Sequence, residues 1–413
     1  MRELKPLRGK IKIKHGFAFK GEHFASHGTY VVLTPGNFHE GGGFKRDEAK
    51  DKFYTSAFPE EYILDTGDLI VAMTEQTDGL LGSCAFVPES DLYLHNQRLG
   101  LISCDPEEVD PEFLYYLFQT SSVRKQIRLS STGSKVKHTS PDRIYDVLAP
   151  LLDVQDQRKL SMILKNLDAK ITLNNEINAE LDAMAKLIYD YWFIQFDFPD
   201  GNGKPYKSSG GKMVWCEQLK RLVPLGWQPT SLWNIARYFN GLAMQKHRPL
   251  GEEFLPVIKI REMGEGFNKG TERAKPDLPS DAIVENGDIL FSWSATLEVM
   301  IWSGGRGALN QHIFKVTPLE HSKPWVYFQL RNYLSHFKMM AERRKTTMGH
   351  ITQDHLKQSR VIDPPSKLVK DFEKLVAPML SQQVQLRTEN QELIRLRDWL
   401  LPMLMNGQIS VRD

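Results

Sequence analysis

The feature that most constrains the fold of this 413-residue chain is an internal repeat. "GDLIVAMTEQ" begins at Gly67, and "GDILFSWSAT" begins at Gly287. Other matches keep the same order, while their offset drifts from about 225 to about 212 residues, as expected when the loops of two copies differ in length. Two copies indicate a duplicated domain, because a solenoid needs about three or more units. These matches are "HGFAFK" from His15 with "NGLAMQ" from Asn240, "LTPGNF" from Leu33 with "IKIREM" from Ile258, Asn96-Gln97 with Asn310-Gln311, and "KHTSPDRI" from Lys137 with "GHITQDHL" from Gly349.

Each copy combines short strands with helices and leads into one long helix. Short β-branched or aromatic runs bounded by turn residues predict the strands. Apolar spacing of three and four predicts helices over 111–127 and 323–340. Gly67-Asp68 and Gly287-Asp288 are expected to form turns that precede buried strands. The predicted strands are "TYVVLT", "DLIVAM" and "LGLISC" in the first copy and "PVIKI", "DILFSW", "VMIW" and "HIFKV" in the second.

The long helices carry the most regular pattern, a heptad seam that runs from about Asp156 to Phe193 and recurs near the C-terminus. About 40 helical residues would span roughly 60 Å, so we expect the two helices to pair with each other. Asn178 and Asn390 occupy equivalent positions and would fix the register, unless they face solvent. Pro378 predicts a kink or a helix start. The seam residues are Leu164, Leu167, Ile171, Asn174, Asn178, Leu181, Ala185, Ile188 and Trp192, then Phe372, Val376, Met379, Gln383, Leu386, Asn390, Leu393, Arg397 and Leu400.

Composition limits the class of protein without identifying it. Apolar residues make up 41% and charged residues 25%, which is ordinary for globular domains. No apolar run approaches the ~20 residues needed to cross a bilayer, and the N-terminus lacks the apolar core of a signal peptide, so we expect a cytoplasmic protein. Cys84, Cys104 and Cys216 are isolated, which predicts buried, reduced thiols.

The net charge of +2 is uninformative, but the basic residues are clustered. The second and third clusters lie at matching places in the two copies. The first comprises Lys5, Arg8, Lys10, Lys12, Lys14 and Lys20; the second Arg124, Lys125, Arg128, Lys135, Lys137 and Arg143; the third Lys338, Arg343, Arg344, Lys345, Lys357 and Arg360.

The block from Gly287 to Val316, "GDILFSWSATLEVMIWSGGRGALNQHIFKV", resembles the target-recognition domain of type I restriction-modification specificity subunits. "GDLIVAMTEQ" with "HNQRLGLI" resembles another version of that domain, and "LRDWLLPMLMNGQISV" resembles the family's C-terminal conserved segment. The resemblance covers nearly the whole chain in the family's order. Ala295 and Glu298 depart from it, because glycines are expected in "SWSATLE".

The resemblance implies an α+β fold with two duplicated mixed α/β target-recognition domains, separated by two long antiparallel coiled-coil helices with pseudo-two-fold symmetry. It places the recognition domains at 1–150 and 199–364 and the spacer helices at 151–198 and 365–413. It implies a non-catalytic subunit that binds a bipartite site in double-stranded DNA and recruits two methyltransferase subunits and the restriction subunits. S-adenosylmethionine, ATP and Mg would then belong to those partners, and the chain itself would need no cofactor or metal.

Within this picture, lysine and arginine would neutralise phosphates while base-edge contacts would supply the sequence information. For each candidate, the alternative is an ordinary solvated charge. Gly41, Gly42 and Gly43 suggest a loop that orders on DNA, or simply a loop. The candidates are Lys20, Lys45, Arg46, Lys135 and Lys137 in the first domain and Gln245, Lys246, Arg248, Arg343, Arg344 and Lys345 in the second.

Aromatic segments near Trp192 and Trp399 are candidates for the partner interface, with packing inside their own domains as the alternative. The sequence contains no motif that supports an enzymatic interpretation. "IDPPSK" has Ser366 where an amino methyltransferase has an aromatic residue, and it fits better as a proline-marked helix entry, like "LAPLLD" from Leu148. No Gly-Lys-Ser or Gly-Lys-Thr phosphate loop is present. A duplicated scaffold protein without DNA binding remains the second hypothesis, and salt-dependent DNA affinity would separate the two.

Overall fold

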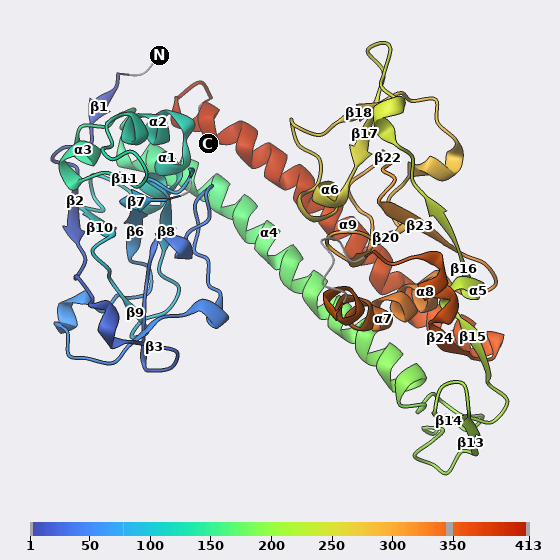
Figure 1. The fold of residues 1–413 in the computed structure, drawn as a ribbon. Coiled ribbons are helices and arrows are strands. Elements are labelled where there is room, and N and C mark those ends of the chain that lie inside the picture. Colours follow the sequence, from blue (N-terminus) through green and yellow to red (C-terminus); the bar gives the residue numbers. More distant parts are fainter. Residues whose placement is uncertain (1–2, 77, 344–349, 410–413) are drawn as a thin grey trace. The chain divides into compact units, whose positions relative to one another are not determined.

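The computed structural model describes residues 3–76, 78–343 and 350–409, except for the side chain of Arg343. The chain divides into two compact units. Unit 1 comprises Met1–Lys170 and Ile394–Asp413, and unit 2 comprises Ile171–Leu393. Each unit therefore contains one globular α+β part and one segment from each of the two long helices, α4 and α9 (Figure 1).

Unit 1 is built on a four-stranded antiparallel sheet of order β2-β10-β6-β8. A second sheet, β3-β5-β4-β9, contains a parallel β4–β9 pair. Helices α1 and α2 supply buried apolar side chains to the core beside the first sheet. The elements are β1 Lys5–Pro6, β2 Ile11–His15, β3 Phe24–Ala25, β4 Tyr30–Val32, β5 Phe53–Tyr54, β6 Leu69–Ala72, β7 Thr74–Glu75, β8 Cys84–Phe86, β9 Tyr93–Leu94, β10 Leu99–Cys104, α1 Pro111–Gln119, α2 Ser121–Leu129, β11 Lys137–His138, α3 Pro141–Tyr145 and β12 Leu148–Ala149.

Unit 2 has the same construction. Its main sheet has the order β16-β23-β20-β21, and its second sheet contains a parallel β17–β22 pair. The elements are β13 Met213–Cys216, β14 Arg221–Pro224, β15 Gln228–Ser231, α5 Leu232–Ile235, β16 Ala236–Asn240, β17 Leu255–Ile258, α6 Ile260–Glu265, β18 Arg273–Ala274, β19 Ile283–Val284, β20 Ile289–Ser292, β21 Glu298–Ile301, β22 Gly307–Leu309, β23 Ile313–Pro318, α7 Lys323–Arg343, α8 Gln353–Gln358 and β24 Arg360–Asp363.

The duplication is confirmed at the level of single hydrogen bonds. Gly67 and Gly287 both have a positive φ, of 88° and 90°, which a glycine adopts without steric cost. The following Asp68 and Asp288 each accept a 2.9 Å bond from the backbone N–H three residues earlier. Strands β6 and β20 then follow, buried along their whole length. The expected turn before a buried strand is thus present in both copies.

A second pair of glycines marks a close approach of two backbones. A Cβ placed on Gly16 would lie 2.2 Å from the carbonyl oxygen of Asn96, and one on Gly241 would lie 2.2 Å from that of Asn310. These are the glycines of "HGFAFK" and "NGLAMQ". Since no side chain fits there, the sequence match has a steric cause.

One predicted helix is two helices in the structure. The expected helix over 111–127 breaks at Thr120, whose ψ of 140° is extended, and resumes as α2. The Thr120 hydroxyl donates to the Leu117 carbonyl at 2.7 Å, and it also accepts from Val123 N–H at the start of α2. One threonine hydroxyl therefore hydrogen-bonds a backbone group at the end of α1 and another at the start of α2, which stabilises the break between the two helices. The counterpart α7 is unbroken.

The two long helices are α4, Val154–Tyr189, and α9, Ser366–Met405. A π-helical turn over Asp190–Ile194 extends α4. Helix α9 begins well before Pro378, so this proline does not start the helix. Both helices follow a proline-containing segment after an edge strand, as the "LAPLLD" and "IDPPSK" pattern predicts.

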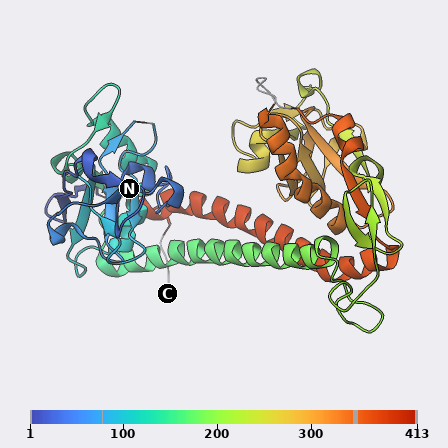
Figure 2. The same ribbon diagram turned by 60° about the horizontal axis from the view of Figure 1, so that its bottom comes forward.

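Within each unit, the α4 and α9 segments lie side by side and antiparallel (Figure 1; Figure 2). In unit 1, Asp168 on α4 binds Arg397 on α9 at 2.9 Å. In unit 2, Asn174 lies against Asn390, and further along α4 the carbonyl of Asn178 accepts from Gln383 at 2.9 Å. Every predicted spacer residue is buried or half-buried, namely Leu164, Leu167, Ile171, Asn178, Leu181, Ile188, Met379, Leu386, Asn390, Leu393 and Leu400.

A polar layer lies inside this helix pair. Asn390 accepts from Asn174 at 2.8 Å and donates to the Ile171 carbonyl at 3.2 Å and to Asn175 at 2.9 Å. The expectation that Asn178 has an equivalent register role fails in this geometry. Its buried amide group has no hydrogen-bond partner within the described part of the chain, and Asn174, one turn earlier, takes the contact.

Candidate nucleic-acid interface

The N-terminal basic cluster is largely neutralised inside unit 1. Arg8 binds Asp146 at 2.8 Å, and Lys10 binds Glu108 at 2.9 Å. The Nζ atom of Lys14 lies 3.6 Å from the Oε2 atom of Glu61 and 4.5 Å from the ring centroid of Tyr62. Lys20, the candidate from this cluster, is exposed just before a short 3-10 turn, and among the described residues it has no ion pair. Lys20 is therefore not neutralised by a carboxylate among the described residues.

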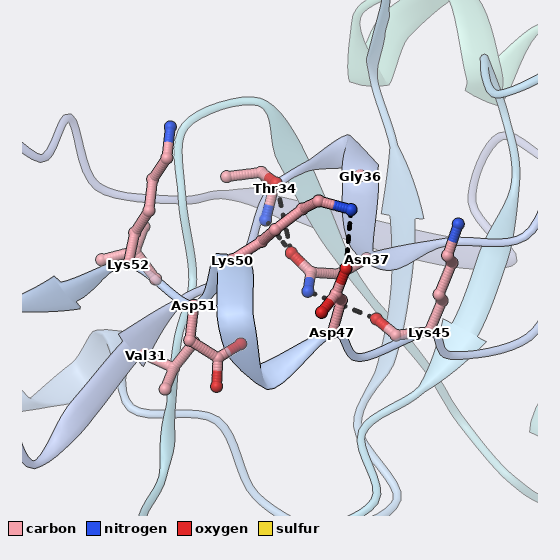
Figure 3. Close-up of a pocket in the computed structure, with 10 residues that line it drawn as sticks. Val31, Thr34, Gly36, Asn37, Lys45, Asp47, Lys50, Asp51 and Lys52 are labelled. Atoms are coloured by element: carbon pink, nitrogen blue, oxygen red, sulfur yellow. Dashed lines mark hydrogen bonds and ion pairs between the residues drawn. The ribbon is translucent and has the colours of Figure 1, made fainter. Parts of the chain in front are cut away.

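Lys45 and Arg46 have different roles despite being neighbours. Lys45 is exposed and lines a 250 Å³ pocket, with Lys52 on its opposite side (Figure 3). Asn37 fixes the backbone of this segment, since its amide donates to the Lys45 carbonyl at 3.3 Å. The third lysine of the pocket, Lys50, is held by Asp47 at 2.6 Å. Lys45 and Lys52 thus remain available to an anion.

Arg46 is held by an internal carboxylate. Its guanidinium binds Asp51 at 2.9 Å, and the Asp51 side chain is only 2% exposed. The hydrogen bond with Asp51 raises the pKa of Arg46, and the guanidinium also lies 5.7 Å from the Tyr93 ring centroid. An arginine tied in this way orders the loop that carries Lys45, and it has few free donors for a base edge.

Lys135 and Lys137 lie on a short hairpin-like segment over Thr132–His138. Lys135 is exposed and Lys137 half-buried. Lys137 pairs in register with Glu75 of β7, a residue that the sequence did not single out. Glu75 is 3% exposed and accepts from the backbone N–H groups of residues 79–81 through one oxygen, while its other oxygen has no partner in the described structure.

Glu75 belongs to a 510 Å³ cleft that the sequence analysis missed. The glycine segment at Gly41 forms one wall, and Gln119 and Arg124 form another. Burial lowers the pKa of Arg124, which donates to the carbonyls of Glu40 and Gly79. One Arg124 nitrogen and the Gln119 amide nitrogen are buried and have no partner within the described residues. The glycine segment and the second basic cluster, far apart in sequence, meet here.

In unit 2, the predicted residues Gln245, Lys246 and Arg248 are exposed on and after a 3-10 turn over Met244–Lys246. This turn follows Gly241, whose close contact with Asn310 fixes the direction of the chain. The side chain of Arg343 and the whole of Arg344 and Lys345 lie outside the described residues, so the structure does not place these three candidates.

A partly exposed aromatic group lies at the end of β20, near the same turn. Trp293 donates from its indole nitrogen to Asn240 at 2.9 Å, and its ring centroid lies 5.6 Å from that of His312 and 5.5 Å from that of His350. The next loop contains Ala295 with a φ of 54°. This left-handed backbone explains why a glycine is expected there. In the part of the chain that the structure describes, no group of His, Cys, Asp and Glu could hold a metal.

The two candidates for a partner interface differ in exposure. Trp192 is 8% exposed and packs against Phe193 and Phe372 in the core of unit 2, which favours the packing alternative for this residue. Trp399 is 54% exposed near the end of α9 and can contact a partner. No helix among the described residues is long and apolar enough to cross a membrane.

Comparison with known proteins gives one consistent result. The family model described as "Type I restriction modification DNA specificity domain" matches residues 3–183 and 224–394. The MjaIX specificity subunit of Methanocaldococcus jannaschii is 22% identical, over 73% of this chain and 70% of that protein. The HindI specificity subunit of Haemophilus influenzae is 24% identical, over 77% of this chain and 82% of that protein. The type I S subunit of M. genitalium has a similar fold, with a TM-score of 0.58 and 14% identity over 97% of this chain and 95% of that one.

Proposed function

The chain belongs to the type I restriction-modification DNA specificity family, and from this premise we propose that it recognises a bipartite sequence in double-stranded DNA, one half-sequence per recognition domain. The observation that carries the proposal is the repeated topology. Sheet order, the parallel strand pair and the turn before the central strand recur in the two units. Two diverged copies of one scaffold can recognise two different half-sequences.

The exposed cations support DNA as the ligand. Lys20, Lys45 and Lys52 in unit 1 and Lys246 and Arg248 in unit 2 have no ion pair within the described residues, and all five are exposed. Such residues neutralise phosphates and set the position of the protein on the duplex. Gln245 precedes Lys246 on the same 3-10 turn and carries an amide suited to an adenine edge in the major groove.

We further propose that the α4–α9 pair sets the gap between the half-sequences. Both helices contribute residues to both units. By itself, a 36-residue helix such as α4 spans about 54 Å. Two recognition modules on one face of B-DNA need centres about one helical turn, roughly 34 Å, apart. A helix pair of this length is sufficient to separate them.

Catalysis is assigned to other subunits in this proposal. Two methyltransferase subunits would bring S-adenosylmethionine, and the restriction subunits would bring ATP and Mg. The specificity subunit then contributes binding energy and position. Its affinity for DNA should fall steeply between low and moderate salt, because several phosphates are neutralised.

Genome-wide methylation mapping in a cell that carries this subunit and its methyltransferase tests the proposal. One asymmetric split motif is expected. Replacing residues 199–364 by the corresponding domain of another specificity subunit should change one half-sequence and leave the other unchanged. A continuous motif, or a swap that alters both halves, would contradict the assignment of one half-sequence to each domain.

A further inference from the structure

Unit 2 contains a second cationic site, separate from the DNA candidates. It is a 370 Å³ pocket between the end of α4, the start of β14, the middle of α7 and the start of β24. Phe193, Ile194, Val361 and Ile362 supply apolar walls, and Arg221 and Arg360 supply the charge. None of its lining residues is Asp or Glu. A pocket with two arginines and no carboxylate is complementary to an anion.

Arg221 is the unusual member of this pocket. It is half-buried and lies 4.8 Å from the centroid of the Phe196 ring. Its Nε atom is buried without a hydrogen-bond partner, and among the described residues it forms no ion pair. Burial lowers the pKa of Arg221, and the groups that oppose this effect are Tyr189, Tyr333 and Cys216, none of which is a carboxyl group. An arginine taken out of water without a counter-charge is costly.

The surroundings add donors around the same space. Tyr189 is 1% exposed, and its hydroxyl has no hydrogen-bond partner in the described structure. Arg360 is exposed at the rim, where the Tyr333 hydroxyl binds its backbone carbonyl. Two arginines and a tyrosine with a buried hydroxyl thus line one pocket, and among the described residues neither arginine forms an ion pair and the hydroxyl has no hydrogen-bond partner.

We propose that this pocket binds a carboxylate from an acidic segment of a partner protein, with Arg221 and Arg360 as its ligands. Planar guanidinium groups bind carboxylates through paired hydrogen bonds. The apolar walls of Phe193, Ile194, Val361 and Ile362 favour a side chain on a flexible peptide over a phosphate of duplex DNA, because a peptide can also place apolar groups against them.

The site is specific to one copy of the duplication. Part of its lining, Leu219 and Arg221, comes from the segment of the β13–β14 hairpin, which has no counterpart among the strands described for unit 1. These residues also fall between the two regions that the family model matches. The inference rests on the proposed function in one respect: it takes the methyltransferase subunit as the partner.

The first test measures binding of the methyltransferase subunit to the full chain. Arg221→Met should weaken this binding at least about 30-fold, because it removes one member of a buried charge pair. Arg360→Met should weaken it less, since this arginine is exposed. Arg306→Met is the matched control, an exposed arginine of unit 2 that pairs with Glu285 at 3.5 Å, and it should change binding less than about twofold.

Thermal unfolding of the isolated chain separates a binding role from a structural one. Arg221→Met should leave the melting temperature unchanged or raise it, because the variant removes a charge that has no partner. DNA affinity should stay at the wild-type value. A lower melting temperature together with equal loss of DNA and methyltransferase binding would show that Arg221 serves the fold, and would overturn the inference.

A photo-crosslink identifies the occupant. Asn332, an exposed residue of the pocket, is replaced by p-benzoylphenylalanine in the full chain. Crosslinking to a methyltransferase peptide that contains Asp or Glu supports the inference, whereas crosslinking to DNA, or to no partner within a complex that forms, overturns it. If wild-type chain binds neither the methyltransferase nor a specific DNA site, the proposed function fails. If the wild-type chain binds both and Arg221→Met leaves methyltransferase binding unchanged, only the inference about the pocket fails.

Discussion

The polar layer of the helix pair makes opposite predictions for two asparagines. Asn390→Ala removes bonds to Asn174, Asn175 and the Ile171 carbonyl. At about 1 kcal/mol net for each bond, less for exposed Asn175, unit 2 should lose about 2 kcal/mol of unfolding free energy. This corresponds to a decrease in melting temperature of roughly 4–8 °C for a unit of this size. Asn178→Ala, in contrast, removes a buried amide that has no partner in the described structure, so it should be neutral or stabilising.

Tryptophan fluorescence follows this unit selectively. Of the eight tryptophans, seven lie within 171–393, and Trp399 is the exception. Thermal unfolding followed by fluorescence in a Trp399→Phe background therefore measures unit 2. Asn174→Ala combined with Asn390→Ala should cost about 1 kcal/mol less than the sum of the two single changes, because they share one bond. Equal effects of Asn178→Ala and Asn390→Ala would refute the assignment of the register contact.

Three further outcomes follow from the geometry. Ala295→Gly should stabilise unit 2 by up to about 1 kcal/mol in urea unfolding, because glycine relieves the strain of a φ of 54°. A measurable loss of stability would contradict this view. Lys45→Ala should weaken DNA binding and lower the magnitude of the slope of log affinity against log salt by about one. Arg46→Ala should instead mainly lower the stability of the fold, because it leaves the buried carboxylate of Asp51 without its ion-pair partner. Burial lowers the pKa of His95 from 6.5 to about 4. The free energy of unfolding should therefore be independent of this group above pH 6.5 and should fall by up to about 3 kcal/mol as the pH falls toward 4, because the unfolded chain binds a proton that the folded chain does not. His95→Gln should flatten this pH dependence in urea unfolding followed by circular dichroism.

The sequence predicted the parts of the fold that depend on local pattern. The turns at Gly67 and Gly287 need glycine for their positive φ, and the central strands after them are continuous apolar runs. Heptad spacing identified the buried face of both long helices. In contrast, the break at Thr120 depends on which hydrogen bond a single threonine makes, and apolar spacing carries no information on that choice.

Side-chain partners were much harder to predict. Arg46 looked like a free cation until Asp51, five residues later, was seen to bind it. Glu75 and Arg124 gave no sequence signal as a pair, because only the tertiary fold brings them to one cleft. The charge of the pocket at Arg221 likewise depends on which described residues line it, none of which is Asp or Glu, and this lining is set only by the tertiary fold.

The most direct test of the whole account lengthens the helix pair. Seven residues are inserted into both α4 and α9 at the boundary between the units, near Lys170 and Ile394. One heptad adds about 10.5 Å of helix, or up to about three base pairs of B-DNA. Methylation mapping should then show the same two half-sequences with a longer gap. An unchanged gap in an active complex, or altered half-sequences, would contradict the claim that the helices set the spacing and the domains set the sequence.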